Sequence, residues 1–209
     1  MNKLNFLPTT IYKFDSSIEL SDHVLEKVKN LDMVANESNH RSVTDLFFDE
    51  KLYQWLEECI DKAKHDIGIP DSVKLTITSC WANRTNKMNA HHSHTHPNSF
   101  MSGVYYLTDG HTGGETIFIT QNTWMKNFDW LDFQNGKNFS VSQNFIPKRG
   151  TLLLFPSSVK HNVTGLRNNS ERYSISFNTF FCGTVSNDDQ KLTRLSISSR
   201  SVRDYYNET

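Results

Sequence analysis

Cysteine is scarce in this 209-residue sequence, and its pattern excludes two classes of small protein. Cys59, Cys80 and Cys182 are odd in number, far apart, and never form a Cys-x-x-Cys pair. A disulfide framework or a cysteine-based zinc ribbon needs paired, closely spaced cysteines. We therefore expect reduced thiols, as in a cytoplasmic protein.

Long hydrophobic runs and an excess of charge are also missing. No apolar run approaches the length of a membrane span, and Met1 to Thr10 lacks the basic and apolar regions of a signal peptide. Lys and Arg number 22 against 23 Asp and Glu, which leaves a net charge of −1. These absences argue against a membrane protein and against a nucleic-acid partner held by bulk electrostatics.

Two helices are predicted in the first third of the chain. Apolar residues recur at helical spacing over Ser17–Leu31, where Asp15 and Ser16 can cap the N-terminus. A second apolar face covers Asp49–Ile67 and ends at Gly68. We expect residues 1–70 to be a helical support for the rest of the domain.

Short β-rich runs separated by turns follow this helical part. Their even spacing is typical of a sandwich or jelly roll. The length suits one domain without internal repeats. We predict an α+β, mainly β chain with a jelly-roll core over 71–182 and a tail over 183–209. The predicted strands are Val73–Trp81, Ser99–Leu107, Glu115–Thr120, Thr151–Phe155, Lys160–Val163 and Arg172–Phe181.

A cluster of histidines is the first sign of chemistry. His91, His92, His94 and His96 fall within six residues. On a strand, His94 and His96 share one face, together with His92. Two imidazoles can occupy neighbouring positions around a metal, and His161, in a later strand-like segment, is the best third candidate. The His-x-His pattern alone is weak evidence, because most histidines are surface or core residues.

Arg172 and Ser174 indicate an anion site. They follow His161 by eleven and thirteen residues and share strand parity. A guanidinium binds a carboxylate through two parallel hydrogen bonds, and a nearby hydroxyl can add a third. If His161 and Arg172 lie on neighbouring antiparallel strands, both can face one interior. A buried arginine needs a partner, and the spacing leaves open whether this is a protein carboxylate or an anionic ligand.

Several segments between Trp81 and Asn178 occur together in a distinctive order: His94 to Pro97, Ser102 to Leu107, Gly150 to Pro156, His161, and Arg172 to Asn178. In this order and at these separations they resemble the iron(II)/2-oxoglutarate dioxygenase superfamily, closest to a branch of small oxygenases of bacteria and marine phages. Three further segments, Tyr106–Asp109, Gly113–Phe118 and Pro147–Gly150, are similar to prolyl 4-hydroxylases.

The resemblance implies a double-stranded β-helix core and an enzyme that uses Fe(II), 2-oxoglutarate and O2. Such enzymes usually hydroxylate a substrate and release succinate and CO2. The location implied is the cytoplasm, or the host cytoplasm for a phage-encoded protein. The sequence does not identify the substrate, which could be a protein side chain or a metabolite. It also does not define the oligomeric state.

Carried over residue by residue, the resemblance makes His94 and His161 iron ligands. It makes Arg172 and Ser174 the clamp for the distal carboxylate of 2-oxoglutarate. Three more residues are implied as co-substrate contacts: Tyr105 or Tyr106 through a hydroxyl, and Asn83 as an orienting amide.

The second position of the histidine motif departs from the superfamily. Most members have Asp or Glu where this chain has His96. We predict that His94, His96 and His161 bind the metal, which leaves the iron one charge more positive than usual. Two other ligand sets stay open, namely His92 paired with His94, or a contribution from Glu115.

The connection between residues 122 and 139 is aromatic and long, as in many lids and binding loops. Trp124 and Trp130 are candidate substrate contacts there, although aromatic packing at a sheet edge explains them equally well. Two other functions compete with the oxygenase. One is a cupin-like three-histidine metalloenzyme without 2-oxoglutarate, and the other is a non-catalytic jelly-roll structural or binding protein.

Overall fold

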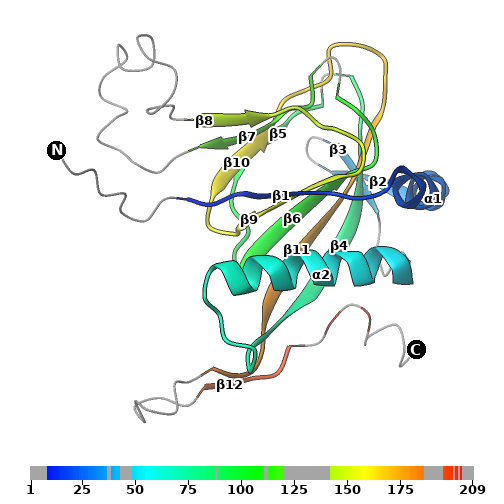
Figure 1. Cartoon of the computed structure of the whole chain (residues 1–209). Helices are drawn as coiled ribbons and strands as arrows, with labels where there is room; N and C mark the ends of the chain where they lie inside the picture. Colours follow the sequence, from blue (N-terminus) through cyan, green and yellow to red (C-terminus); the bar gives the residue numbers. More distant parts are fainter. Residues whose placement is uncertain are drawn as a thin grey trace, which may run out of the picture.

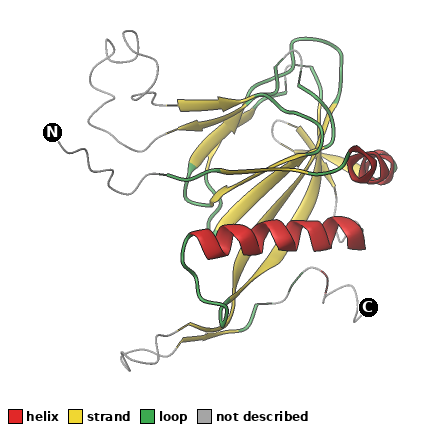
Figure 2. Ribbon diagram, in the orientation of Figure 1, coloured by secondary structure: helices red, strands yellow, loops and turns green. Residues whose placement is uncertain are grey.

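Two β-sheets face each other in the computed structural model, which describes residues 9–36, 39–42, 49–87, 89–110, 113–119, 142–185, 195–199, 201 and 203. Figure 1 shows that helix α2 crosses the outer face of the larger sheet, and Figure 2 shows the strands gathered behind it. The arrangement is the predicted jelly roll, in which the two sheets do not close into a barrel.

Every strand pairing within the named sheets is antiparallel. The larger sheet has the order β1 (Tyr12–Asp15), β9 (Thr151–Pro156), β6 (Met101–Tyr106), β11 (Arg172–Val185), β4 (Lys74–Thr85), β3 (Asn39–Ser42) and β2 (Met33–Asn36), and β12 (Leu195–Ile197) pairs with β11. The smaller sheet has the order β5 (His91–His94), β10 (Lys160–Val163), β7 (Thr116–Ile119) and β8 (Ser142–Phe145).

Helices α1 (Ile18–Lys29) and α2 (Glu50–Asp66) lie close to their predicted ranges. Asp49 caps α2 by accepting hydrogen bonds from the Lys51 and Leu52 amides, and Gly68 follows its end with a φ of 79°. The predicted caps of α1 were wrong, because β1 extends to Asp15 and the helix begins only after Ser17. Among the described residues no helix is both long and apolar enough to cross a membrane.

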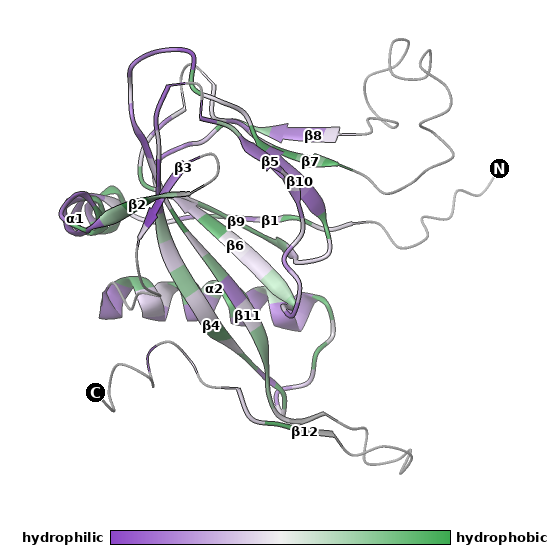
Figure 3. Ribbon diagram, turned by 180° about the vertical axis from the view of Figure 1, so that it is seen from behind, coloured by the Kyte–Doolittle hydropathy of each residue, from purple (hydrophilic) through white to green (hydrophobic). Residues whose placement is uncertain are grey.

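Strand alternation divides the larger sheet into an apolar face and a partly polar face. On β11, Tyr173, Ile175 and Phe177 pack against the helices in the main hydrophobic core. Arg172 and Ser174 point the other way, toward the smaller sheet. Figure 3 shows this alternation as bands of differing hydropathy along β4 and β11. Polar side chains are thereby enclosed between the sheets, which is where a site can form.

The expectation that residues 1–70 form only a helical support is incomplete. β1, β2 and β3 come from this part and extend the larger sheet at both edges. These strands have only four residues each, too few for their sequence alone to define a strand, so their pairing with the core decides their structure. The predicted tail likewise begins inside a strand, because β11 continues to Val185 and pairs with β12.

Candidate metal and co-substrate site

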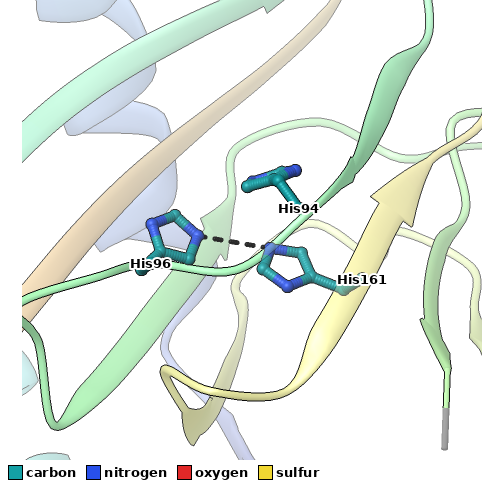
Figure 4. A group of neighbouring side chains, drawn as sticks. All are labelled: His94, His96 and His161. Atoms are coloured by element: carbon teal, nitrogen blue, oxygen red, sulfur yellow. Dashed lines mark hydrogen bonds between the residues drawn. The ribbon is translucent and has the colours of Figure 1, made fainter. Parts of the chain in front are cut away.

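Three histidines from separate places in the chain converge between the sheets. His94 ends β5 and lies opposite His161 of β10, whereas His96 follows two residues after the strand. The His96 amide is fixed by a 3.0 Å hydrogen bond to the Ser157 carbonyl. One ring nitrogen from each histidine lies within 4.8 Å of the other two. Figure 4 shows the three side chains gathered together.

Hydrogen bonds behind two of these rings fix which nitrogen is free. Nδ1 of His94 lies 2.7 Å from the His92 carbonyl oxygen, and Nδ1 of His161 lies 2.9 Å from that of Val159. Because a carbonyl only accepts, each Nδ1 carries the proton and each Nε2 presents a lone pair. Metal-binding histidines are oriented by such bonds.

Burial in the pocket also favours the neutral form of the His96 and His161 rings. Burial, followed by the neighbouring His161 and His94, lowers the pKa of His96 to about 3. Burial likewise lowers the pKa of His161 to about 4. Nε2 of His96 lies 3.3 Å from Nε2 of His161, near the separation of about 3 Å expected for adjacent ligands with metal–nitrogen bonds of about 2.1 Å. The donor set therefore fits a divalent transition metal.

A β-bulge decides which other histidine faces the site. His94 pairs with His161 but His91 pairs with Val163, so that two residues of β5 oppose the single Asn162 of β10. This irregularity turns His91 and His94 to the same face and leaves His92 exposed. The predicted parity of His92 with His94 was wrong for this reason, and the ligand pair of His92 and His94 is excluded.

Glu115 is the other alternative ligand that the geometry disfavours. Its carboxylate accepts a hydrogen bond from the Thr164 hydroxyl. Its amide donates to the same hydroxyl at 2.9 Å. It is absent from the group of ligand atoms formed by the three histidines. Glu115 thus binds Thr164, in the loop that follows β10.

Arg172 lies in the same cavity with most of its hydrogen-bonding capacity unused. The side chain is 4% exposed, and burial lowers the pKa of its guanidinium. Nη1 donates to the Gly114 carbonyl at 2.6 Å and Nη2 to the Thr85 hydroxyl at 3.2 Å, whereas Nε has no partner. Within the described part of the chain no carboxylate pairs with it. Of the two partners left open by the sequence, the described residues favour an anionic ligand over a protein carboxylate.

Gly114 allows this close approach. It has a φ of 76°, and a Cβ at this position would lie 3.3 Å from Cδ of Arg172. A side chain here would be strained and would crowd the guanidinium.

Arg172 and His161 come from opposite sheets, not from neighbouring strands as expected. β11 pairs with β4 and β6, whereas β10 pairs with β5 and β7. The two side chains still share one cavity, because the inward faces of both sheets line it. Its walls include Trp81, Asn83, Thr85, His91, His94, His96, Val104, Thr116, Phe155, His161, Val163, Arg172, Ser174 and Ser176.

Comparison with known families agrees with this geometry. Residues 79–178 match the family model described as "Putative 2OG-Fe(II) oxygenase". The matched segment, which carries the three histidines, Arg172 and Ser174, is thus similar to the 2OG-Fe(II) oxygenases. Members of this family depend on Fe(II) and 2-oxoglutarate and use O2, and the three imidazoles beside an unpaired guanidinium fit those groups.

Solved structures show the same fold as this oxygenase at low sequence identity. A 2OG-Fe(II) oxygenase family oxidoreductase from Burkholderia pseudomallei is 16% identical, with a TM-score of 0.59 over 81% of this chain and 83% of that one. A prolyl-4-hydroxylase from Pseudomonas putida is 15% identical, with a TM-score of 0.58 over 81% of this chain and 92% of that one. HygX from Streptomyces hygroscopicus, with nickel and 2-oxoglutarate bound, is 12% identical, with a TM-score of 0.60 over 94% of both chains. No curated protein matches the sequence.

The two predicted tyrosines of the oxygenase lie on opposite faces of β6. Tyr105 packs against Trp55 of α2 at a ring distance of 5.3 Å, and its hydroxyl lies 2.7 Å from that of Ser16. Because it faces the helices, Tyr105 is excluded from a clamp around Arg172. Tyr106 faces inward, but its hydroxyl is bonded to that of Thr116 at 2.6 Å.

The two other predicted co-substrate contacts of the oxygenase line the cavity. Ser174 is 1% exposed, and its hydroxyl has no partner in the described part of the chain. The amide of Asn83 donates to the Ser176 hydroxyl at 3.0 Å and accepts from Asn39 at 3.1 Å. Asn83 therefore also orders the cavity wall.

The cavity residues that the sequence did not predict include His91 and Thr85, and two predicted residues, Trp124 and Trp130, cannot be placed. His91 was missed because strict alternation puts it opposite His94. Thr85 was missed because β4 was expected to end at Trp81, four residues too early. Trp124 and Trp130 lie outside the described residues.

Proposed function

We propose that this oxygenase binds Fe(II) through His94, His96 and His161 and grips 2-oxoglutarate through Arg172 and Ser174. We further propose that it hydroxylates a substrate, with release of succinate and CO2. The proposal rests on one cavity that holds three converging imidazoles and a buried guanidinium with which no carboxylate of the described residues pairs.

The three histidines supply a binding site with a fixed shape and no charge. Backbone carbonyls hold the protons of His94 and His161 on Nδ1, so that both Nε2 atoms stay available. The rings of Phe118 and Phe155 lie 5.8 and 4.8 Å from that of His161 and limit access of water to it. When bound, Fe(II) with 2-oxoglutarate and O2 supplies the oxidising chemistry.

Arg172 orients the co-substrate from the opposite sheet. Its free N–H groups can bind the distal carboxylate, while Gly114 and Thr85 hold the guanidinium in place. The unpartnered Ser174 hydroxyl lies one same-face step along β11 and can donate a further bond. A dicarboxylate would also compensate the positive charge that three neutral ligands leave on the metal.

Hydroxylation is the outcome we propose for the substrate. The prolyl-4-hydroxylase of the same fold supports it, although the epimerase SnoN and the carbocyclase SnoK, both from nogalamycin biosynthesis, share that fold as well. A protein side chain or a metabolite both suit an open cavity of this kind. A cupin-like enzyme without 2-oxoglutarate would leave Arg172 buried with no ligand, which disfavours it.

Succinate release tests the proposed function directly. The wild-type protein should form succinate from 2-oxoglutarate only with Fe(II), and His161→Ala or Arg172→Ala should lower the rate by at least about a hundredfold. His92→Ala is the matched control, because this exposed side chain should leave the rate unchanged. Full activity in His161→Ala would remove that residue from the metal site.

Hydroxylation is tested separately from co-substrate turnover. Peptides with proline and a panel of metabolites would be incubated with the active protein and analysed by mass spectrometry. A product heavier by one oxygen atom supports a hydroxylase. A product that is isomerised or has lost two hydrogen atoms instead would contradict that assignment but leave the oxygenase intact.

A further inference from the structure

His91 belongs to the cavity but has no assigned task. It lines the same space as Arg172 and the three ligand histidines, and its ring stands edge-on to that of His94 at 4.5 Å. In the described part of the chain neither of its ring nitrogens has a hydrogen-bond partner. It is also outside the group whose ligand atoms converge.

The register of the smaller sheet places His91 between the metal site and Arg172. His94, His161 and Phe118 lie side by side across β5, β10 and β7. The next residues on that face, one step of about 7 Å along the strands, are His91, Val163 and Thr116.

Gly114 lies two residues before the start of β7 at Thr116, and its carbonyl accepts a hydrogen bond from Arg172. A five-carbon dicarboxylate that extends from the metal toward the guanidinium must therefore pass the level of His91. Both His91 and Arg172 line this cavity.

We infer that His91 is a second anchor for the distal carboxylate of 2-oxoglutarate and donates a ring N–H to it beside Arg172. The inference rests on the proposed function. It gives His91 a role that the sequence suggested for Tyr105 or Tyr106. Tyr105 faces the helices, and the Tyr106 hydroxyl already has one hydrogen bond, to that of Thr116.

An imidazole ring suits this task. A neutral imidazole donates one hydrogen bond and does not place a second cation next to the guanidinium. His91 would thus add direction to the clamp without adding charge repulsion.

Calorimetric titration of the nickel-loaded protein tests the inference without turnover. The variant His91→Phe keeps a ring against His94 but removes the N–H, and His91→Gln restores a donor. His92→Ala is the control on the exposed side of the same bulge. Each protein would be titrated with 2-oxoglutarate and with 2-oxopentanoate, which has a methyl group in place of the distal carboxylate, and its nickel content would be measured.

We expect His91→Phe to weaken 2-oxoglutarate binding by roughly tenfold to a hundredfold. His91→Gln should recover part of this loss. Affinity for 2-oxopentanoate and the nickel content should stay at the wild-type level in both variants.

Three outcomes would overturn the assignment. They are wild-type affinity for 2-oxoglutarate in His91→Phe, an equal loss for both keto acids, and loss of nickel. A wild-type protein that binds nickel but not 2-oxoglutarate would instead overturn the proposed function, and the role of His91 with it.

Discussion

Each side chain of the site has one chemical task that its immediate surroundings define. The imidazoles of His94 and His161 are held by carbonyl groups and offer a lone pair. The guanidinium of Arg172 is held by Gly114 and Thr85 and offers N–H groups. Preorganisation of this kind reduces the entropy lost when a ligand binds.

At the residue scale, the sequence reasoning identified the groups with the strongest chemical signature. His94, His96, His161 and Arg172 were selected from their order and spacing, and the structure brings them to one cavity. His91 was not selected, because only the bulge in β5 turns it inward, and no local residue pattern marks that bulge.

Replacement of Arg172 by methionine should separate ligand binding from stability. A buried guanidinium without a counter-charge contributes little to folding, and an apolar side chain of similar length can replace it. We expect Arg172→Met to weaken 2-oxoglutarate binding at least about a hundredfold. The free energy of unfolding in urea should change by less than about 2 kcal/mol. A variant that no longer folds would show that Arg172 is structural.

The charge at position 96 should tune the affinity for the co-substrate. His96→Asp restores the carboxylate that is usual in this superfamily and removes one positive charge from the metal site. Two unit charges about 5 Å apart interact by roughly 3 kcal/mol at an effective dielectric constant of about 20. We therefore expect 2-oxoglutarate binding to weaken by about a hundredfold, measured on nickel-loaded protein.

His96→Glu is a second variant, in case the shorter aspartate does not reach the metal. Nickel content would be checked in both. Unchanged or tighter 2-oxoglutarate binding in a variant that retains nickel would contradict the charge argument.

At the scale of elements, the site depends on strands that are held by their partners. β10 lies between β5 and β7 and carries His161 at its centre, which fixes this histidine more firmly than a loop could. Helices α1 and α2 and the long strands were predictable from apolar periodicity. The four-residue strands β1, β2, β3 and β8 were not, because tertiary pairing and not local sequence determines them.

The cap of α2 offers a test at this scale. Asp49 caps the helix and also binds Lys27 at 2.7 Å and His23 at 2.9 Å, which ties α2 to α1. Asp49→Ala should lower the free energy of unfolding by about 1–2 kcal/mol in urea. Asp49→Asn keeps a capping group and should cost less, and equal losses in the two variants would show that the cap itself contributes nothing.

The same residue predicts a pH dependence. Burial raises the pKa of Asp49, but hydrogen bonds from Lys27 and His23 outweigh burial and lower it to about 2. Since the pKa is lower in the folded state, the stabilisation is complete above about pH 4 and is lost as the pH falls toward about 2. The stability difference between wild type and Asp49→Asn should narrow over that range, and a constant difference would contradict this account.

At the scale of the whole molecule, the ligands would connect the two sheets. His94 and His161 belong to the smaller sheet, whereas Arg172 belongs to the larger one. The jelly roll itself was predictable from the regular spacing of strands. The opposition of His161 and Arg172 across the cavity was not, because strand order in space is set by long-range pairing.

Thermal unfolding should report this connection. At ligand concentrations of about a hundred times Kd, binding adds about 2.7 kcal/mol, or roughly 5–10 °C in Tm for a chain of this size. We expect nickel alone to raise Tm, and 2-oxoglutarate to raise it further only when nickel is present. Arg172→Ala should keep the Tm increase with nickel and lose most of the further increase with 2-oxoglutarate. Retention of both increases would contradict a bridge through Arg172.

The most direct test is an anaerobic titration of the Fe(II)-loaded protein with 2-oxoglutarate, followed by visible absorption. Chelation of the metal by the co-substrate should produce a charge-transfer band that saturates at one equivalent. The band should be absent in His161→Ala and should need at least about a hundredfold more 2-oxoglutarate in Arg172→Ala. A titration curve that neither substitution changes would show that these residues do not share a site.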